Sequence, residues 1–309
     1  TGAKYDSKAF KKSVGLNGVG IKAVNALSSM FILRSIRDGQ VKEIEFNAGN
    51  VVRDEALKAS KEDNGTEVIF TPDELMFGNY HYITEYVENM LKNYTYLNAG
   101  MVINFNGNRI ISRNGLVDLL NDNMNTEGLY PIIHLRGEDI EIAITHGLQY
   151  GEDYYSFVNG QHTSQGGTHL MSFKEAVVKT IKDFFKKDFD PSDVRSSIIA
   201  AVSVKIEEPI FESQTKTKLG SKDMSPEGPS VRNFIIDFVR KHLDDYLHKN
   251  SETAQIMLKK IQESEKERKA ISSIQKLARD RAKKVSLHNR KLRDCRIHYN
   301  SNDERRLDS

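Results

Sequence analysis

The chain has 309 residues, of which 38% are hydrophobic and 28% charged, with a formal net charge of +2. This composition excludes a disordered or fibrous protein and is typical of a globular one with room for two domains. A single cysteine, Cys295, excludes an internal disulfide and argues against a structural zinc site. No apolar run approaches the roughly 18 residues of a membrane-spanning helix, and no signal peptide pattern opens the chain. We therefore expect a cytoplasmic protein.

The charge is unevenly distributed along the chain. Residues 259–309 hold sixteen Lys/Arg against eight Asp/Glu, which gives this segment +8 and leaves −6 for the rest. The asymmetry favours a polyanionic partner, although a solvated helix face with charges of both signs explains it equally well.

A glycine-rich stretch near the start raises the first functional question. Gly15, Gly18 and Gly20 in "GLNGVG" precede a segment whose apolar spacing predicts a helix, residues 21–27. Glycines at a helix start let backbone N–H groups turn toward a phosphate, but three glycines also occur in ordinary turns. The stretch is neither a P-loop nor a dinucleotide-binding fingerprint, because the Gly-Lys-Ser/Thr ending and the preceding strand are missing.

The remaining pattern predicts two regions of strands and helices. In the first we expect a hairpin turning at Asp38-Gly39, a strand in "TEVIFTP", a helix over "YHYITEYVENMLKNYTYL", a strand in "MVINFN" and a short helix in "GLVDLLNDN". Polar, turn-forming residues 121–128 predict the boundary. We accordingly divide the chain into residues 1–125, 126–292 and a linker, 293–309.

The second region is predicted to be another α/β unit. Strands are expected in "YPIIHLRGEDIEIAITHG" and "DYYSFVNG", then a helix from Phe173 to Lys187. The apolar run "SSIIAAVSVKI" predicts a strand buried on both faces. A helix over 230–249 follows, and another begins at Ser251 and extends toward Lys284.

Distant motifs together resemble one protein family. The order "GLNGVG", "KAVNALS", "NGTEVIFTPD", "YLNAG", "FVNGQHTSQGGTHL" and "SVKIEEPIFESQTKTKLGS" resembles the B subunits of bacterial type IIA DNA topoisomerases, gyrase and topoisomerase IV. The resemblance covers nearly the whole chain. Its most discriminating parts are "GGTH" at residues 166–169 and "QTK" at residues 214–216. It implies the C-terminal part of a GHKL-type ATPase α/β sandwich, with a mixed sheet and helices on one face, followed by a two-layer α/β transducer domain with a left-handed crossover and a long C-terminal helix.

The resemblance also implies a split ATP site. Backbone amides of the glycine loop would wrap the phosphates, lid lysines would approach them, an aromatic residue would lie beside adenine, and a threonine would hold adenine through water. The matching positions are Lys4, Phe10, Lys11, Leu16, Asn17, Gly18, Val19, Gly20 and Thr66. Lys216, with Gln214, would reach the γ-phosphate from the second domain, and Mg²⁺ would complete the site in the whole protein. Composition alone instead predicts an exposed, solvated "QTKTK" loop.

The resemblance further implies what lies outside this sequence. The family's general-base glutamate, its Mg²⁺-binding asparagine and an adenine-reading aspartate precede the position that matches Thr1, and its DNA-cleavage domain follows "KLRDC". We therefore expect a fragment that does not hydrolyse ATP alone, and Glu207 and Glu208 are interpreted as surface residues rather than substitutes. We list no metal ligand in the chain.

In the family, two B subunits dimerise when ATP binds and close a gate over a DNA duplex, while the A subunit cuts DNA. The implied partners are double-stranded DNA, the A subunit and a second copy of the B subunit, with no membrane. Basic residues on or near the helix at 173–187 are candidates for contact with DNA phosphates, namely Lys179, Lys182, Lys186, Lys187 and Arg195. Half of them also fit a plain solvated helix face. His169 is interpreted as a packing or hydrogen-bonding residue.

Two alternatives remain open at this stage. One is a DNA-binding or scaffold module without nucleotide use, and the other is a mismatch-repair ATPase of the MutL type, against which "GGTH" and "QTKTKLGS" speak. Between the two topoisomerases, Asn17 and "KDMSPEGPSVRNF" favour topoisomerase IV.

Overall fold

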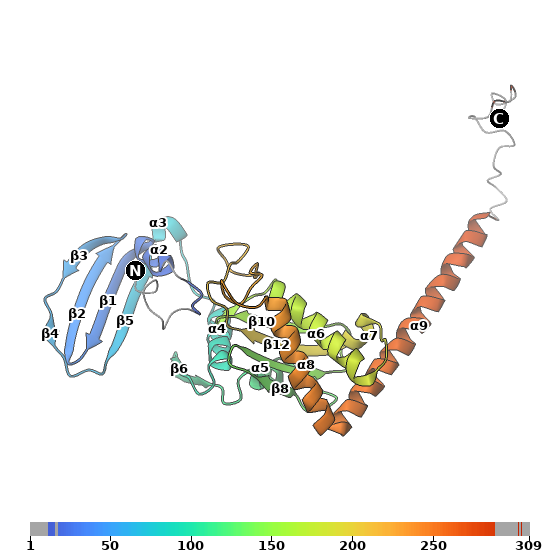
Figure 1. The fold of residues 1–309 in the computed structure, drawn as a ribbon. Helices are drawn as coiled ribbons and strands as arrows, with labels where there is room; N and C mark the ends of the chain where they lie inside the picture. Colours follow the sequence, from blue (N-terminus) through green and yellow to red (C-terminus); the bar gives the residue numbers. More distant parts are fainter. Residues whose placement is uncertain (1–11, 16–17, 288–301, 303, 305–309) are drawn as a thin grey trace.

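The computed structural model describes residues 12–15, 18–287, 302 and 304. The first sheet consists of antiparallel strands in the order β3-β2-β1-β5, with the short β4 paired to β2. The helix α2 precedes this sheet and α3 follows it (Figure 1). The bounds are α2 Val19–Ala26, β1 Ser28–Arg37, β2 Gln40–Asn47, β3 Asn50–Asp54, β4 Lys58–Ala59, β5 Gly65–Pro72 and α3 Glu74–Phe77.

The β1–β2 hairpin turns at the predicted residues. Asp38 and Gly39 both have positive φ, 51° and 75°, which suits the tight turn that matches the twist of paired strands. The mixed sheet expected for this region is not formed by the described residues, since the strand pairs of this sheet among them are all antiparallel. β3 and β4 were not predicted, because their few residues carry no alternation long enough to recognise.

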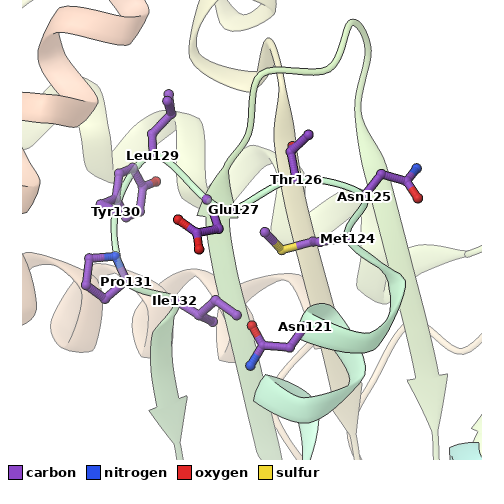
Figure 2. A pocket seen from close by; sticks show the side chains of 10 residues that line it. Asn121, Met124, Asn125, Thr126, Glu127, Leu129, Tyr130, Pro131 and Ile132 are labelled. Atoms are coloured by element: carbon purple, nitrogen blue, oxygen red, sulfur yellow. The ribbon is translucent and has the colours of Figure 1, made fainter.

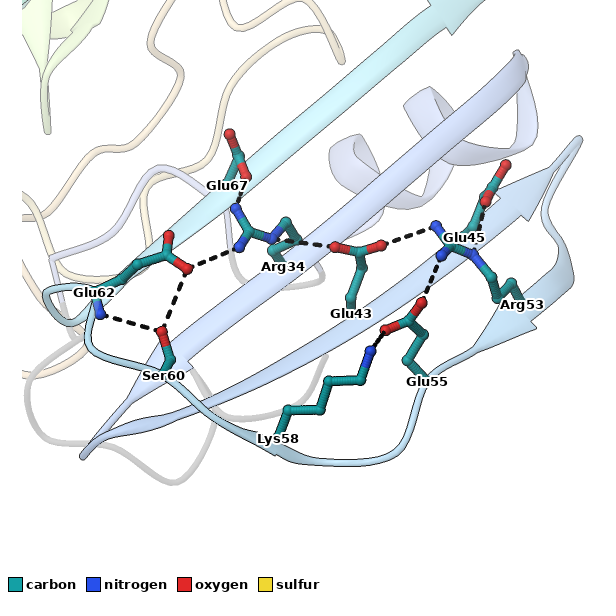
Figure 3. A network of polar contacts seen from close by, with 9 residues as sticks. All are labelled: Arg34, Glu43, Glu45, Arg53, Glu55, Lys58, Ser60, Glu62 and Glu67. Carbon is teal, nitrogen blue, oxygen red and sulfur yellow. Dashed lines mark hydrogen bonds and ion pairs between the residues drawn. The ribbon is translucent and has the colours of Figure 1, made fainter.

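The two faces of the first sheet differ in chemistry. Cross-strand partners Phe31, Phe46 and Phe70 share one face, and α2 lies over it, where Val24 and Leu27 line an apolar pocket with Phe70. The opposite face carries ion pairs that join neighbouring strands, as Figure 3 shows. Arg34 contacts Glu43, Glu62 and Glu67, and Arg53 contacts Glu43, Glu45 and Glu55. Such exposed pairs add little stability, but they mark this face as the solvent side.

A helix, a hairpin and a second helix lead to the next sheet. Their bounds are α4 Thr84–Leu97, β6 Val102–Phe105, β7 Asn108–Ile111 and α5 Leu116–Asn123. Tyr96 of α4 donates a hydrogen bond to Asp122 of α5 at 2.5 Å, and Asp118 accepts from the Ser112 hydroxyl just ahead of α5. The helices were predicted, whereas β7 was not distinguished from a turn.

The second sheet has the order β11-β10-β12-β9-β8 and is mixed, because β10 and β12 are parallel while the other pairs are antiparallel. The strand bounds are β8 Ile133–Arg136, β9 Ile140–His146, β10 Asp153–Val158, β11 Gln161–His162 and β12 Ile198–Val204. The helix bounds are α6 Thr168–Phe185, α7 Pro191–Arg195, α8 Val231–Lys249 and α9 Ser251–Leu287. β12 is buried along nearly its whole length, as predicted.

Both faces of this sheet are covered. Alternate residues such as Ile142, Val158 and Val202 pack with α6, α8 and the start of α9 in the main core. Their neighbours Ala143, Phe157 and Ala201 pack with Leu116 and Leu120 of α5 in a smaller one. The boundary at residue 125 therefore separates α5 from the sheet on which it packs, and the domain limits remain a prediction.

Two helix bounds differ from expectation. α6 begins at Thr168, five residues before Phe173, because its first turn is set by contacts of the "GGTH" motif rather than by apolar spacing. It ends at Phe185, and Lys186 adopts the left-handed conformation as its C-cap, so Lys186 and Lys187 lie beyond the helix.

The C-terminal part of the long α9 extends away from the other helices and strands (Figure 1). No helix among the described residues is long and apolar enough to cross a membrane.

Candidate phosphate-binding site between the glycine loop and the Lys216 loop

A cavity of about 930 Å³ lies where two segments about 200 residues apart in sequence meet. One is the glycine loop, whose described residues are Gly15, Gly18, Val19 and Gly20. The other is the loop of residues 210–221, called the Lys216 loop below. The described lining residues are Ser13, Val14, Gly15, Gly18, Val19, Gly20, Ile21, Gln161, Pro209, Phe211, Glu212, Ser213, Gln214, Thr215 and Lys216.

Lys216 makes the contact that joins the two segments. Its Nζ donates a hydrogen bond to the carbonyl oxygen of Val14 at 3.0 Å, and it would lie 3.5 Å from a Cβ placed on Gly15. The backbone of Lys216 has φ of 57°, in the left-handed region that side chains other than glycine rarely adopt. Local strain of this kind persists only where surrounding contacts enforce it, and it is common at functional sites.

The helix that follows the glycine loop places its first residues at the cavity. α2 begins after Gly18, which has φ of 60° and makes no side-chain cap to the helix. The first N–H groups of a helix have no partner inside the helix, and they carry the positive end of its dipole. The ammonium of Lys216 and these amides are therefore suited to an anion held between them.

The acidic residue among the described lining residues is Glu212, and it is ion-paired with Lys218 at 2.9 Å. Glu207 and Glu208 do not line the cavity within the described part of the chain. Because Lys218 neutralises Glu212, the ammonium of Lys216 is the charge left uncompensated among the described lining residues. This agrees with the interpretation of Glu207 and Glu208 as residues outside the site.

A second contact holds the same N-terminal segment against the second sheet. Lys12 donates to Asp139, in the turn between β8 and β9, at 2.6 Å, and this hydrogen bond raises the pKa of Lys12. Nothing in the sequence pattern marks Asp139, because a carboxylate beside a turn is common. Gln161 of β11 and Phe211 were likewise not predicted to face the site.

The sequence-predicted site residues fall into three groups. Lys216, Gln214, Gly18, Val19 and Gly20 come together at the cavity. Thr66 lies on β5, opposite Ser35 of β1, and is exposed on the apolar face of the first sheet rather than in the described lining of this cavity. The others, Lys4, Phe10, Lys11, Leu16 and Asn17, lie outside the described residues.

The basic residues near α6 differ in whether an acidic side chain already pairs with them. Lys182 pairs with Asp188 at 2.6 Å, Lys187 approaches Glu265 at 3.7 Å, and Arg195 pairs with Glu152 at 3.1 Å. For Lys179 and Lys186, no ion pair is formed with any described residue. The two lysines are therefore the better candidates for contact with a polyanion.

Two histidines of the second sheet region are buried and hydrogen-bonded. His169 of "GGTH" contacts the Thr163 hydroxyl at 3.2 Å, and burial lowers its pKa to about 4. His146 lies between the Tyr130 hydroxyl, 2.5 Å away, and the Val194 carbonyl, 2.9 Å away, and burial lowers its pKa to about 4 as well. The prediction of a packing and hydrogen-bonding role for His169 is confirmed.

Another hollow, of about 580 Å³, lies in the connection between α5 and β8. Figure 2 shows Asn121, Met124 and Glu127 around the same space, with Ile132 on the next part of the connection. Glu127 is the charged residue in its lining. We assign no ligand to it.

Comparison with known proteins decides the family. A sequence model of DNA gyrase B matches residues 82–277. The chain belongs to the DNA gyrase B family. The match includes the Lys216 loop and the "GGTH" motif, and the glycine loop lies upstream of it.

Relatives of this gyrase B family chain come from several bacteria. It is 43% identical over 305 residues to the B subunit of DNA topoisomerase 4 from Borreliella burgdorferi, which covers 98% of the chain and 50% of that protein. It is 31% identical over 318 residues to the B subunit of DNA gyrase from Helicobacter pylori strain J99, which covers 95% of the chain and 40% of that protein. The chain therefore spans half or less of the length of these two relatives.

Solved structures of the family share the fold. The 43K ATPase domain of Thermus thermophilus gyrase B, in complex with an aminocoumarin, matches with a TM-score of 0.68 at 25% identity, over 84% of the chain and 75% of the solved one. The ATP-binding domain of Francisella tularensis topoisomerase IV, with a small-molecule inhibitor, matches with a TM-score of 0.66 at 25% identity, over 82% and 73%. The predicted fold class is thereby confirmed.

Proposed function

We propose that this chain contributes the phosphate-sensing part of the ATP-driven motor of a type II DNA topoisomerase. The observation that carries the proposal is the hydrogen bond from Lys216 to Val14, which brings a positive charge on a long side chain to the glycine loop across 202 residues of sequence. The names of the two solved structures support ATP as the nucleotide.

The geometry suggests how ATP and ADP are told apart. The amides at the start of α2 would hold phosphate oxygens, and Lys216 would leave the Val14 carbonyl for the terminal phosphate, a stronger partner because it is ionised. Without that phosphate, Lys216 would return to Val14. The ligand thus biases a two-state contact, as a nucleotide switch requires.

In the proposed site, nucleotide recognition is divided between residues of this chain and others. Leu16, Asn17, Gly18, Val19 and Gly20 would hold the phosphates, Lys4 and Lys11 would approach them, and Phe10 and Thr66 would contact the adenine. The described residues contain no group of three acidic, histidine or cysteine side chains that could hold a metal. We accordingly propose no ligand for Mg²⁺ in this chain.

The partners follow from the same proposal. We infer double-stranded DNA as substrate, a DNA-cleaving A subunit as the partner for strand passage, and a second copy of the B subunit as the partner on ATP binding. Because the relative with 43% identity comes from a topoisomerase 4, we favour topoisomerase IV over gyrase. The activity would relax or unlink DNA by coupling ATP use to the passage of one duplex through another.

A titration followed by NMR tests the nucleotide proposal on the 309-residue chain itself. At millimolar concentrations, a non-hydrolysable ATP analogue should shift the amide signals of Gly18, Gly20 and Lys216. ADP should shift the two glycine signals and leave Lys216 nearly unchanged. Lys216→Ala should abolish the difference between the two nucleotides, whereas Lys218→Ala, in the same loop, should preserve it. Identical responses to both nucleotides, or none from either loop, would contradict the proposal.

A further inference from the structure

The "GGTH" motif lies against the Lys216 loop, not against the cavity itself. Gly166, Gly167 and Thr168 form the turn that starts α6, and none of them lines the described cavity. The nucleotide proposal gives the motif no role. Gly166, Gly167 and Thr168 nevertheless make several close contacts with residues that immediately follow Lys216.

Backbone hydrogen bonds join the turn to this loop on both sides. Gln165 N–H donates to the Thr217 carbonyl at 2.9 Å, Leu219 N–H donates to the Gly166 carbonyl at 3.0 Å, and Thr168 N–H donates to the Leu219 carbonyl at 3.2 Å. The Thr168 hydroxyl adds a fourth bond, to the Ser221 carbonyl at 2.7 Å. The segment 217–221 is therefore held to the start of α6 like a short strand.

Gly167 makes the close approach possible. Its φ is 130°, and a Cβ added there would lie 2.3 Å from the Leu219 carbonyl oxygen and 2.5 Å from the Leu219 nitrogen. Those neighbours are backbone atoms, which cannot move aside without moving the loop. A side chain at position 167 would thus displace the residues that follow Lys216.

The turn is also fixed to the second sheet. His169 is fully buried and contacts the Thr163 hydroxyl, which donates to the Ser156 carbonyl of β10 at 2.8 Å. These hydrogen bonds connect β10 and α6 to the Lys216 loop, whose tip carries the strained backbone of Lys216.

We propose that Gly167 and Thr168 are positioning residues for Lys216: their turn holds the Lys216 loop so that the lysine reaches the glycine loop. The positioning role deepens the proposed function, and its part in nucleotide sensing rests on that function. The mechanical part, in which the turn sets the place of Lys216, is independent of any nucleotide. Through this turn, a shift of α6 relative to the glycine loop would change the reach of Lys216.

Amine footprinting of the intact chain tests the mechanical part. The rate at which an acylating reagent modifies Lys216 is measured by mass spectrometry relative to Lys179, which has no ion pair to a described residue. Thr168→Val keeps the shape of the side chain and removes the hydroxyl, so the relative rate at Lys216 should rise about fivefold, as expected for one hydrogen bond of about 1 kcal/mol. Thr168→Ser should restore the wild-type rate. Thr180→Val, the same change about three turns further along α6, should have no effect.

Hydrogen exchange of the unsubstituted chain keeps the test independent of whether a variant folds. The amides of Gln165, Thr168 and Leu219 should have the same protection factor once each is corrected for its intrinsic exchange rate, because they open together. An unchanged Lys216 modification rate in folded Thr168→Val, or unrelated protection factors of the three amides, would overturn the proposal.

Repeating the nucleotide titration on Thr168→Val separates the positioning proposal from the proposed nucleotide function. In Thr168→Val, the response of Lys216 to the ATP analogue should weaken while the response of Gly18 to ADP stays the same. If wild-type chain shows no nucleotide response but the footprint changes as expected, the nucleotide proposal fails and the positioning role stands. If wild-type chain senses the nucleotide but the Lys216 footprint of Thr168→Val is unchanged, the positioning role fails instead.

Discussion

At the scale of single residues, the backbone of Lys216 is the least expected feature of the site. Its left-handed conformation disfavours any side chain by about 1 kcal/mol relative to glycine. Sequence could identify Lys216 only through the family motif, because "QTKTK" by composition is an exposed loop. The strain was not predictable, since it arises from contacts of the whole loop.

Comparison of Lys216→Gly with Lys216→Ala tests that strain. Both variants lose the ammonium, but glycine adopts the left-handed conformation freely, so Lys216→Gly should have the higher free energy of unfolding by about 1 kcal/mol. Denaturant unfolding measures the difference. At Lys218, whose φ is not positive, the order should reverse. A Lys216→Gly variant less stable than Lys216→Ala would show that the backbone is not strained.

Two buried histidines make stability depend on pH. Burial lowers the pKa of His146 and of His169 to about 4 in the folded chain, whereas both titrate near 6.5 when unfolded. The unfolded state therefore binds more protons between these values, so stability is full above about pH 6.5 and falls as the pH drops toward 4. The loss is about 3 kcal/mol for each histidine.

His146→Gln should reduce this loss. The variant keeps a donor for the Val194 carbonyl but cannot take up a proton, so its free energy of unfolding should fall by about 3 kcal/mol less than that of wild type between pH 7 and pH 4. Urea unfolding at a series of pH values gives the comparison. Parallel pH curves for the two proteins would mean that His146 is not the titrating group.

At the scale of secondary structure, long periodic segments were predictable and short ones were not. Helices α4, α5, α8 and α9, the β1–β2 hairpin and the buried strand β12 were predicted from spacing and turn residues. Apolar periodicity predicted that α6 starts at Phe173. The true start at Thr168 depends on contacts of "GGTH" with residues 217–221, which are distant in sequence and leave no periodic signal. β3, β4, β11 and α7 are too short for a periodic signal.

The structure sorts the basic residues near α6 into paired and unpaired ones, which gives a prediction for DNA binding. Replacing Lys179 and Lys186 together with alanine should weaken binding of a linear duplex and lower the salt slope by about 2, because each removes a phosphate contact. The matched control replaces Lys182 and Lys187, which already contact Asp188 and Glu265. Fluorescence anisotropy at several salt concentrations measures both. Equal losses for the two pairs would contradict the assignment.

At the scale of the whole molecule, the central feature is a site made by segments far apart in sequence. No periodicity or charge pattern links the glycine loop to Lys216, and only the family resemblance placed them together. The structure brings five of the predicted residues to one cavity and leaves Thr66 elsewhere. The contacts of Lys12 with Asp139 and of Lys216 with Val14 hold the same short segment against the second sheet.

Crosslinking across the cavity tests this central claim most directly. In a Cys295→Ser background, Gly15→Cys places a thiol where the Cβ lies 3.5 Å from Lys216 Nζ, within reach of a short thiol-to-amine crosslinker. Mass spectrometry should find the new thiol joined mainly to Lys216 rather than to Lys218. A non-hydrolysable ATP analogue should reduce this product strongly, and ADP should not. Absence of the Lys216 product, or a yield indifferent to the ATP analogue, would contradict a phosphate site shared by the two loops.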